Sequence, residues 1–326
     1  MKGVFLSFRL ETESDFRTRE FSLSKEINSS VLTSAYNITF FQPTGSSEGF
    51  YLVTEPLHDR VGVFSPTDMA YLGPLGKGFI QYQYPTSLLA LSGGGLLLLE
   101  THKMHVFDGR CLPTQELVGS FHGLTEGENG DIYTMSDNKI VKFVFVDGKY
   151  KFEDEIQLSA VNEFEERRHL SKPRYLVYSK GRIHISDMGL HKLLLVDLNT
   201  GKQTATGYFG EGKGQFKCPA GMVADRDGNL LLLDQGNNRV LVYTSSGNWV
   251  EVVASGQQEG LEQPCGIFMH MNRVLVTFMS PDVGAWSGSA WESNLIVILL
   301  LDTEIYCKAQ SNCLNLKKGL LLKLFT

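Results

Sequence analysis

The feature that most constrains the fold is an internal repeat, whose clearest copy spans residues 216–249. Two short apolar segments in it, Leu230–Leu233 and Val240–Tyr243, flank the turn Gly236-Asn237-Asn238. Asp227-Gly228 before the first segment is a strong hairpin signal, because both central positions of a type I′ turn favour positive φ. Pro219 cannot donate to a strand ladder and belongs in the loop before the opening strand. Four short strands in about 35 residues are typical of one propeller blade.

Weaker copies of the same unit precede and follow this one, which makes six in all. In five of them a basic residue opens the third strand, at intervals of 36 to 53 residues. These residues are Arg60, Lys103, Lys139, Lys192 and Arg239. A period of about 40 to 50 residues with four strands per unit predicts an all-β, six-bladed β-propeller with four-stranded antiparallel blades. A helical solenoid is disfavoured, because apolar spacing at i, i+3, i+4 and i+7 is not sustained outside the two ends.

The chain is predicted to have three parts: a charged N-terminal segment (1–35), the propeller (36–302) and a tail (303–326) that does not resemble a blade. The N-terminal segment is either a tail or an outer strand that closes the ring. Closure matters because an open propeller exposes sheet edges. An acidic excursion from Tyr150 to His169 is expected between the third and fourth blades.

Composition favours a soluble, intracellular protein. The net charge of −6 and the isoelectric point near 5.8 weigh against a dedicated nucleic-acid binder. Five widely spaced cysteines, without a Cys-x-x-Cys pair, suit reduced thiols in the cytoplasm. The longest apolar run, Leu295–Leu301, is far shorter than the roughly 20 residues that span a bilayer.

The unit from Gly210 to Val240 closely resembles the NHL repeat. The resemblance rests on Pro219, Gly221, Asp225, Asp227-Gly228-Asn229, Asp234 and Asn237-Asn238-Arg239, and it is partial in the other copies. It implies an NHL-type six-bladed propeller like the C-terminal domain of TRIM-NHL proteins, which bind RNA or protein partners through it. No cysteine spacing fits a RING or B-box, so the resemblance implies recognition without ubiquitin-ligase activity by this chain.

The five basic residues are expected to ring one face, because the loop before a blade's third strand lies on the same face as the blade-to-blade connection. Such a ring is suited to phosphates or to an acidic peptide. The alternative is that each cation pairs with an acid of its own or the next blade; the candidates are Asp59, Asp137, Asp187 and Asp234. His58, His102 and His191 share this face and either stack on bases or are solvated loop residues.

Trp286 and Trp291 lie in a loop rich in glycine and serine. Tryptophans on such loops are enriched at binding hot spots, and the alternative is that both pack against the closing blade.

A propeller enzyme of the metal-dependent lyase or lactonase type is the alternative function. The innermost strands are expected at Leu88–Leu91, Leu176–Tyr178, Met222–Asp225 and Ile267–His270, and only Asp225 and His270 are plausible inward ligands. Two ligands are too few for a zinc site, and no nucleophile elbow or phosphate loop is present. The sequence therefore predicts a non-catalytic platform without metal or cofactor. Its expected partner is a protein in preference to single-stranded RNA, with no DNA or membrane binding.

Overall fold

The computed structural model describes residues 20–28, 32, 35–76, 78–161, 167–168, 170–256, 263–270, 273–278 and 295–302. Trp286, Trp291 and the predicted tail (303–326) lie outside the described residues. Within them the chain is built of β-strands joined by tight turns, among them the short 3-10 turns Pro56–His58 and Gln235–Asn237. No helix in the described part of the chain is long and apolar enough to cross a membrane.

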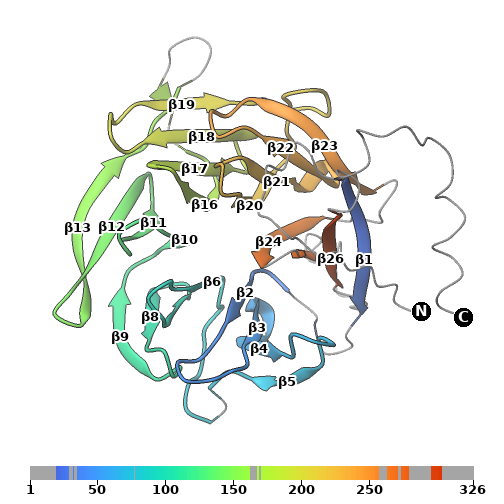
Figure 1. Cartoon of the computed structure of the whole chain (residues 1–326). Coiled ribbons are helices and arrows are strands. Elements are labelled where there is room, and N and C mark those ends of the chain that lie inside the picture. Colours follow the sequence, from blue (N-terminus) through green and yellow to red (C-terminus); the bar gives the residue numbers. More distant parts are fainter. Residues whose placement is uncertain are drawn as a thin grey trace, which may run out of the picture.

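Within the described residues, five antiparallel sheets each consist of four consecutive strands arranged around a centre (Figure 1). The first strand of each sheet is innermost and the fourth is outermost. The strands are β2 Ile38–Phe41, β3 Phe50–Glu55, β4 Arg60–Phe64 and β5 Tyr71–Pro74; β6 Ser87–Ala90, β7 Leu96–Leu99, β8 Lys103–Phe107 and β9 Pro113–Val118; β10 His122–Glu126, β11 Ile132–Ser136, β12 Lys139–Val146 and β13 Lys149–Gln157; β16 Pro173–Ser179, β17 Arg182–Asp187, β18 Lys192–Asp197 and β19 Gln203–Thr206; β20 Pro219–Ala224, β21 Leu230–Asp234, β22 Arg239–Tyr243 and β23 Trp249–Ser255.

A further four-stranded sheet is not built from consecutive strands. It contains β24 (Pro264–His270), β25 (Arg273–Phe278), β26 (Leu295–Asp302) and β1 (Glu20–Asn28), and β1 pairs antiparallel with β26. The all-β propeller with four-stranded antiparallel blades is thus confirmed, whereas blades of consecutive strands number five among the described residues and not six.

The expected acidic excursion is partly wrong. Its first residues form β13, the long outer strand that pairs with β12. The charged side chains that suggested a loop suit a strand with one solvated face. A short pair, β14 (Ala160–Val161) with β15 (Arg167–Arg168), follows it.

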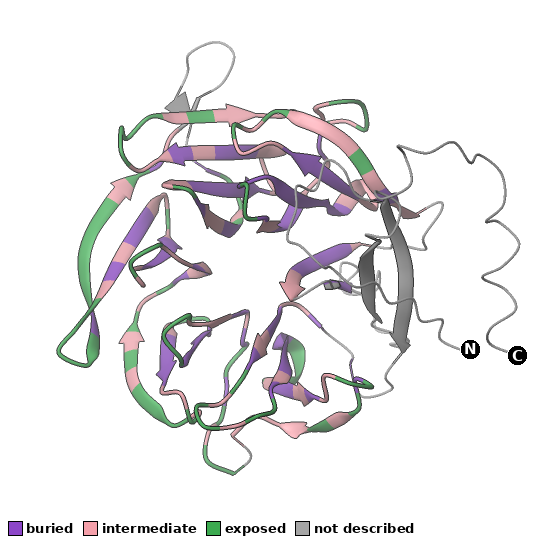
Figure 2. Cartoon of the chain, viewed as in Figure 1, coloured by how far each residue is buried: buried purple, intermediate pink, exposed green. Residues whose placement is uncertain are grey.

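The hydrophobic core lies between neighbouring blades. One cluster joins Leu97, Leu99 and Met104 of one blade to Ile132 and Val141 of the next. The continuous apolar runs at β7 and β21 are buried along their whole length, as expected for a strand covered on both faces. Outer strands such as β9 and β13 are largely exposed (Figure 2).

Two features hold neighbouring sheets close together near the centre. Gly123 has a φ of +65°, and a Cβ there would lie only 3.0 Å from the carbonyl oxygen of Arg174 in the next blade. A side chain at this position would therefore push β10 away from β16. The buried hydroxyl of Thr277 donates a hydrogen bond of 2.9 Å to the carbonyl oxygen of Tyr36, which ties the sheet of β24 and β25 to the segment before β2.

Candidate functional site

The predicted ring of cations occupies the position that the repeat indicates. Each of the five is the first residue of its blade's third strand; these strands are β4, β8, β12, β18 and β22. Ion pairs within a blade engage Arg60, Lys103, Lys139 and Arg239. The pairs are Arg60 with Glu55 (2.6 Å), Lys103 with Glu116 (3.0 Å), Lys139 with Glu155 (2.7 Å) and Arg239 with Asp234 (2.8 Å). Lys192 stands opposite Asp187 in the register of β17 and β18.

The residue before the cation has a structural role in four blades. Its side chain accepts a backbone N–H from the segment that leads into the next blade. The four bonds run to Asp59 from Tyr84 (2.7 Å), to Asn138 from Leu170 (3.0 Å), to His191 from Cys218 (3.0 Å) and to Asn238 from Gln263 (2.8 Å). The Nδ1 atom of His191 therefore links two blades. His58 and His102 are exposed on the same loops. Partner binding by this face stays a prediction.

The two channel ligands expected from the sequence are engaged elsewhere. Asp225 follows the last residue of β20, and its carboxylate accepts hydrogen bonds from the N–H (2.8 Å) and side chain (3.1 Å) of Asn229. His270, the last residue of β24, stacks on Phe40 with ring centroids 3.8 Å apart, and its Nδ1 lies 3.1 Å from the Tyr51 hydroxyl. Both belong to the far ends of the inner strands, and neither lines the central cavity.

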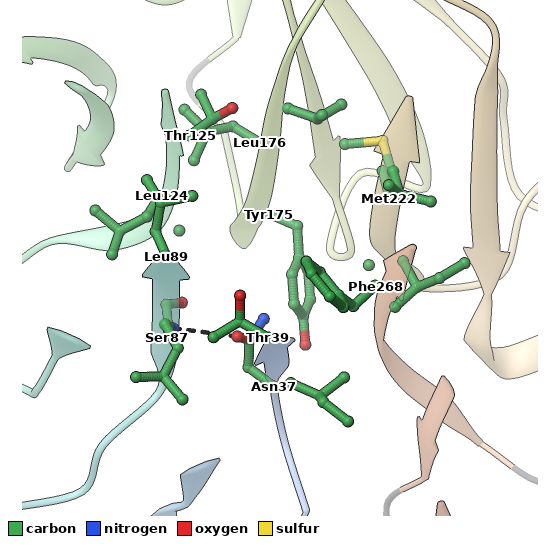
Figure 3. Close-up of a pocket in the computed structure, with 17 residues that line it drawn as sticks. Asn37, Thr39, Ser87, Leu89, Leu124, Thr125, Tyr175, Leu176, Met222 and Phe268 are labelled. Atoms are coloured by element: carbon green, nitrogen blue, oxygen red, sulfur yellow. Dashed lines mark hydrogen bonds between the residues drawn. The ribbon is translucent and has the colours of Figure 1, made fainter. Parts of the chain in front are cut away.

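The inner strands β2, β6, β10, β16, β20 and β24 enclose a central cavity of about 160 Å³ (Figure 3). Its apolar lining includes Leu89, Leu124, Leu176, Met222 and Phe268. Its polar lining consists of Asn37, Thr39, Ser87, Thr125 and Tyr175. The expected innermost strands are confirmed by this arrangement.

His122 and Arg174 stand at the start of β10 and β16, and the residue after each of them lines the cavity. Burial lowers the pKa of His122, the positive charge of Arg174 lowers it further, and Asp137 partly opposes both. Arg174 is exposed, and it forms no ion pair with the described carboxylates. His122, whose lowered pKa favours the neutral imidazole, and Arg174, which forms no ion pair with the described carboxylates, thus each stand directly before a residue of the cavity lining.

A buried group of three side chains lies under this mouth. The Tyr175 hydroxyl is 2.8 Å from the Cys265 sulfur, and the Tyr36 and Tyr175 rings stack with centroids 5.9 Å apart. Burial raises the pKa of Tyr36 and raises that of Cys265 to about 12, and the charge of Arg174 opposes both shifts. The charge of Arg174 therefore acts on side chains of β10 and β24 and of the segment before β2. The Cys265 thiol stays protonated at neutral pH and is a poor nucleophile.

The cavity lining does not fit a catalytic metal ion. Its side-chain donors are one amide, four hydroxyls and no carboxylate, imidazole or thiol. A hard cation normally needs six or more oxygen ligands with carboxylates among them, and zinc needs nitrogen, sulfur or carboxylate ligands. No group of three or more histidines, cysteines or acids suited to a metal occurs among the described residues.

Sequence reasoning missed His122, Arg174 and Tyr175. A signal was available, because a proline opens the inner strand in several copies and the next residue is Ala220 or Cys265 in two of them. A charged residue, Arg174, follows Pro173 instead. An arginine at a position where other copies have a small residue is the signal that could have indicated the site.

No family model matches this chain. Its structure is similar to virginiamycin B lyase from Staphylococcus aureus (17% identity, TM-score 0.55, 86% of this chain and 99% of that one). It is also similar to luciferin-regenerating enzyme (12%, 0.57, 84% and 92%) and to the calcium-binding protein regucalcin from Agrobacterium tumefaciens strain C58 (14%, 0.54, 92% and 95%). At these identities the likeness shows the propeller fold.

These structures correct one expectation. The sequence predicted a chain that is not an enzyme, yet the propellers that it resembles along nearly their whole length include a lyase and a second named enzyme. The prediction relied on finding motifs such as a nucleophile elbow. A propeller needs no such motif, because its site is assembled from single residues on separate blades.

Proposed function

We propose that this chain is a propeller lyase that opens a cyclic ester by proton abstraction, with His122 as the general base and Arg174 as the stabiliser of negative charge. The observation that carries the proposal is that His122 and Arg174, on the neighbouring inner strands β10 and β16, each stand directly before a residue that lines the central cavity, and that the charge of Arg174 helps to lower the pKa of His122. The likeness to a streptogramin B lyase, at 16% identity and a TM-score of 0.56, supports the proposal in so far as a propeller of this fold can hold a lyase site.

In the proposed step, His122 accepts a proton from the carbon next to a carbonyl group. The electron pair of that C–H bond forms a C=C bond to the β carbon, the β carbon–oxygen bond breaks, and a carboxylate leaves. The imidazolium then returns its proton to water. A positioned base contributes about 10²- to 10⁴-fold to such a reaction. Arg174 stabilises the negative charge that develops on the carbonyl oxygen and on the leaving group.

Elimination is favoured over hydrolysis through a covalent intermediate. A covalent route requires an activated nucleophile, and burial holds the Cys265 thiol protonated. A base that stays neutral near pH 7 is what proton abstraction requires, and both burial and Arg174 favour that state of His122.

The proposal includes a closed ring of six blades of the NHL type, in which the sheet β1-β26-β25-β24 is the sixth blade and β1 closes the ring. The Thr277 hydrogen bond to Tyr36 supports this arrangement, as does the cavity wall that Ile267 and Phe268 of β24 provide. Without that blade the cavity would open on one side.

The test is to incubate the protein with quinupristin, which was bound in the structure of a catalytically inactive virginiamycin B lyase, and with a panel of lactones in which the carbon next to the alkoxy carbon carries a carbonyl substituent. Elimination gives a ring-opened product of unchanged mass with a new C=C absorbance, whereas hydrolysis adds one water. We expect His122→Gln to lower kcat about 10²- to 10⁴-fold and Arg174→Met about 10²-fold. Arg110→Met, at an exposed arginine remote from the cavity lining, is the control. Wild-type activity in His122→Gln would refute the assignment.

A further inference from the structure

The size of the central cavity restricts what enters it. A volume of about 160 Å³ is close to that of an engineered apolar protein cavity of about 150 Å³ that binds benzene. The cavity therefore accommodates one phenyl ring or one branched aliphatic group of similar size, and not a sugar chain or a nucleotide.

The polar lining residues offer few groups to a ligand. The Asn37 side-chain oxygen accepts the N–H of Leu88 at 3.1 Å, and the Thr125 hydroxyl accepts the N–H of Tyr178 at 2.8 Å. The Tyr175 hydroxyl contacts Cys265. These three groups hold neighbouring strands together, which leaves the hydroxyls of Thr39 and Ser87 as the polar side-chain groups beside the apolar side chains shown in Figure 3.

The mouth has the opposite character. Arg174 stands directly before the lining residue Tyr175, is exposed, and supplies a positive charge that pairs with no described carboxylate. A molecule complementary to both parts has a compact apolar group joined by a short linker to a carboxylate or an ester carbonyl.

We infer that the substrates are aryl-substituted or branched-alkyl-substituted esters, whose apolar group fills the cavity while the carbonyl rests beside Arg174. This inference rests on the proposed function for the position of the carbonyl. The apolar group acts as the specificity element, and Leu124 is the wall residue that sets its size.

Binding of product-like acids tests the inference without turnover. In calorimetric titrations of the full chain, 3-phenylpropanoate is expected to bind about 10- to 100-fold tighter than propanoate, because burial of one phenyl group contributes that much. Arg174→Met is expected to weaken the binding of 3-phenylpropanoate and to leave the affinity for 3-phenylpropanol unchanged. Equal affinity for propanoate and 3-phenylpropanoate would overturn the inference.

Variants of the wall residue sharpen the test. Leu124→Phe reduces the cavity volume and is expected to weaken the binding of 3-phenylpropanoate at least about tenfold. Leu124→Ala enlarges the cavity and is expected to strengthen the binding of 3-naphthylpropanoate. Leu72→Phe and Leu72→Ala, on the exposed outer strand β5, are the matched controls. Thermal unfolding of each variant shows that the fold is retained. If both Leu124 variants bind the series as the Leu72 variants do, the inference is wrong.

The outcomes separate the inference from the proposed function. Ester turnover without any preference for the phenyl group would support the lyase and contradict the cavity's role. The expected binding series without turnover of any cyclic ester would support the cavity's role and contradict the lyase.

Discussion

The rim of the propeller and the mouth of its central cavity use the same residue type in opposite ways. On the rim, Arg239 pairs with the buried Asp234 and donates further hydrogen bonds to the carbonyl oxygens of Glu211 and Gln215. At the mouth, Arg174 has none of these partners among the described residues and is exposed. The rim cation repeats from blade to blade, whereas Arg174 replaces a small residue. Charge at the repeated position is engaged in ion pairs within a blade, and charge at the exceptional position is available to a ligand.

The largest expected effect on stability is at the rim. Arg239→Met leaves Asp234, whose side chain is completely buried, without its cation. Removal of one partner of a buried pair costs about 3–5 kcal/mol of unfolding free energy. Urea denaturation measures the change, and Arg110→Met is the control. A loss below about 1 kcal/mol would show that the rim arginine is not structural and is available for a partner.

Protonation of a buried histidine is expected to have the next largest effect. His184 lies on β17 with neither ring nitrogen hydrogen-bonded in the described structure, and burial lowers its pKa to about 4. The folded state therefore favours the neutral ring. The contribution of the neutral His184 ring to the free energy of unfolding is complete above pH 6.5, the ordinary pKa of histidine. It is lost as the pH falls toward 4.

The pH dependence of His184 is measurable by denaturation. Between about pH 7.5 and about pH 4.5 we expect the unfolding free energy to fall by about 2–3 kcal/mol. His184→Leu suits the neighbouring Val177 and Leu195 and removes this part of the pH dependence. An equal fall in the variant would assign the acid sensitivity to other groups.

Ring closure is expected to show a smaller effect. Thr277→Val keeps the shape of the side chain and removes the hydrogen bond to the Tyr36 carbonyl oxygen, which leaves a buried acceptor unsatisfied. We expect a loss of about 1–3 kcal/mol, with Thr114→Val, on an outer strand, as the control. An unchanged free energy of unfolding would show that this hydrogen bond does not stabilise the contact between the sheet of β24 and β25 and the first blade.

An exposed rim pair is expected to contribute least among the cations. Lys139 and Glu155 are both more than one third exposed, so their attraction is screened by water. Lys139→Met should lower the unfolding free energy by about 0–1 kcal/mol. A loss as large as that of Arg239→Met would remove the distinction between buried and exposed rim pairs.

The sequence predicted what depends on local pattern. Prolines, turns and apolar runs located the inner strands, and the turn before the third strand located Arg60 and Arg239. It named Asp234, the partner of Arg239, but not Glu116 or Glu155, since these lie on outer strands whose register to the third strand is set by tertiary pairing. The mouth was missed for the same reason, because His122 and Arg174 meet only when separate blades close around the centre.

Arg174→Met tests whether the arginine at the mouth, unlike the rim cations, contributes little to the stability of the fold. Because Arg174 is exposed and forms no ion pair with the described residues, its loss should change the unfolding free energy by no more than about 0.5 kcal/mol. The pKa of His122 should rise, because a positive charge that disfavours the imidazolium is gone, yet stay below its ordinary value, because burial remains. Titration of the imidazole by NMR measures this shift, and Arg110→Met should leave it unchanged. A stable variant with an unshifted His122 would mean that the two side chains do not form one site. A destabilised variant would mean that Arg174 stabilises the fold as the rim arginine Arg239 does.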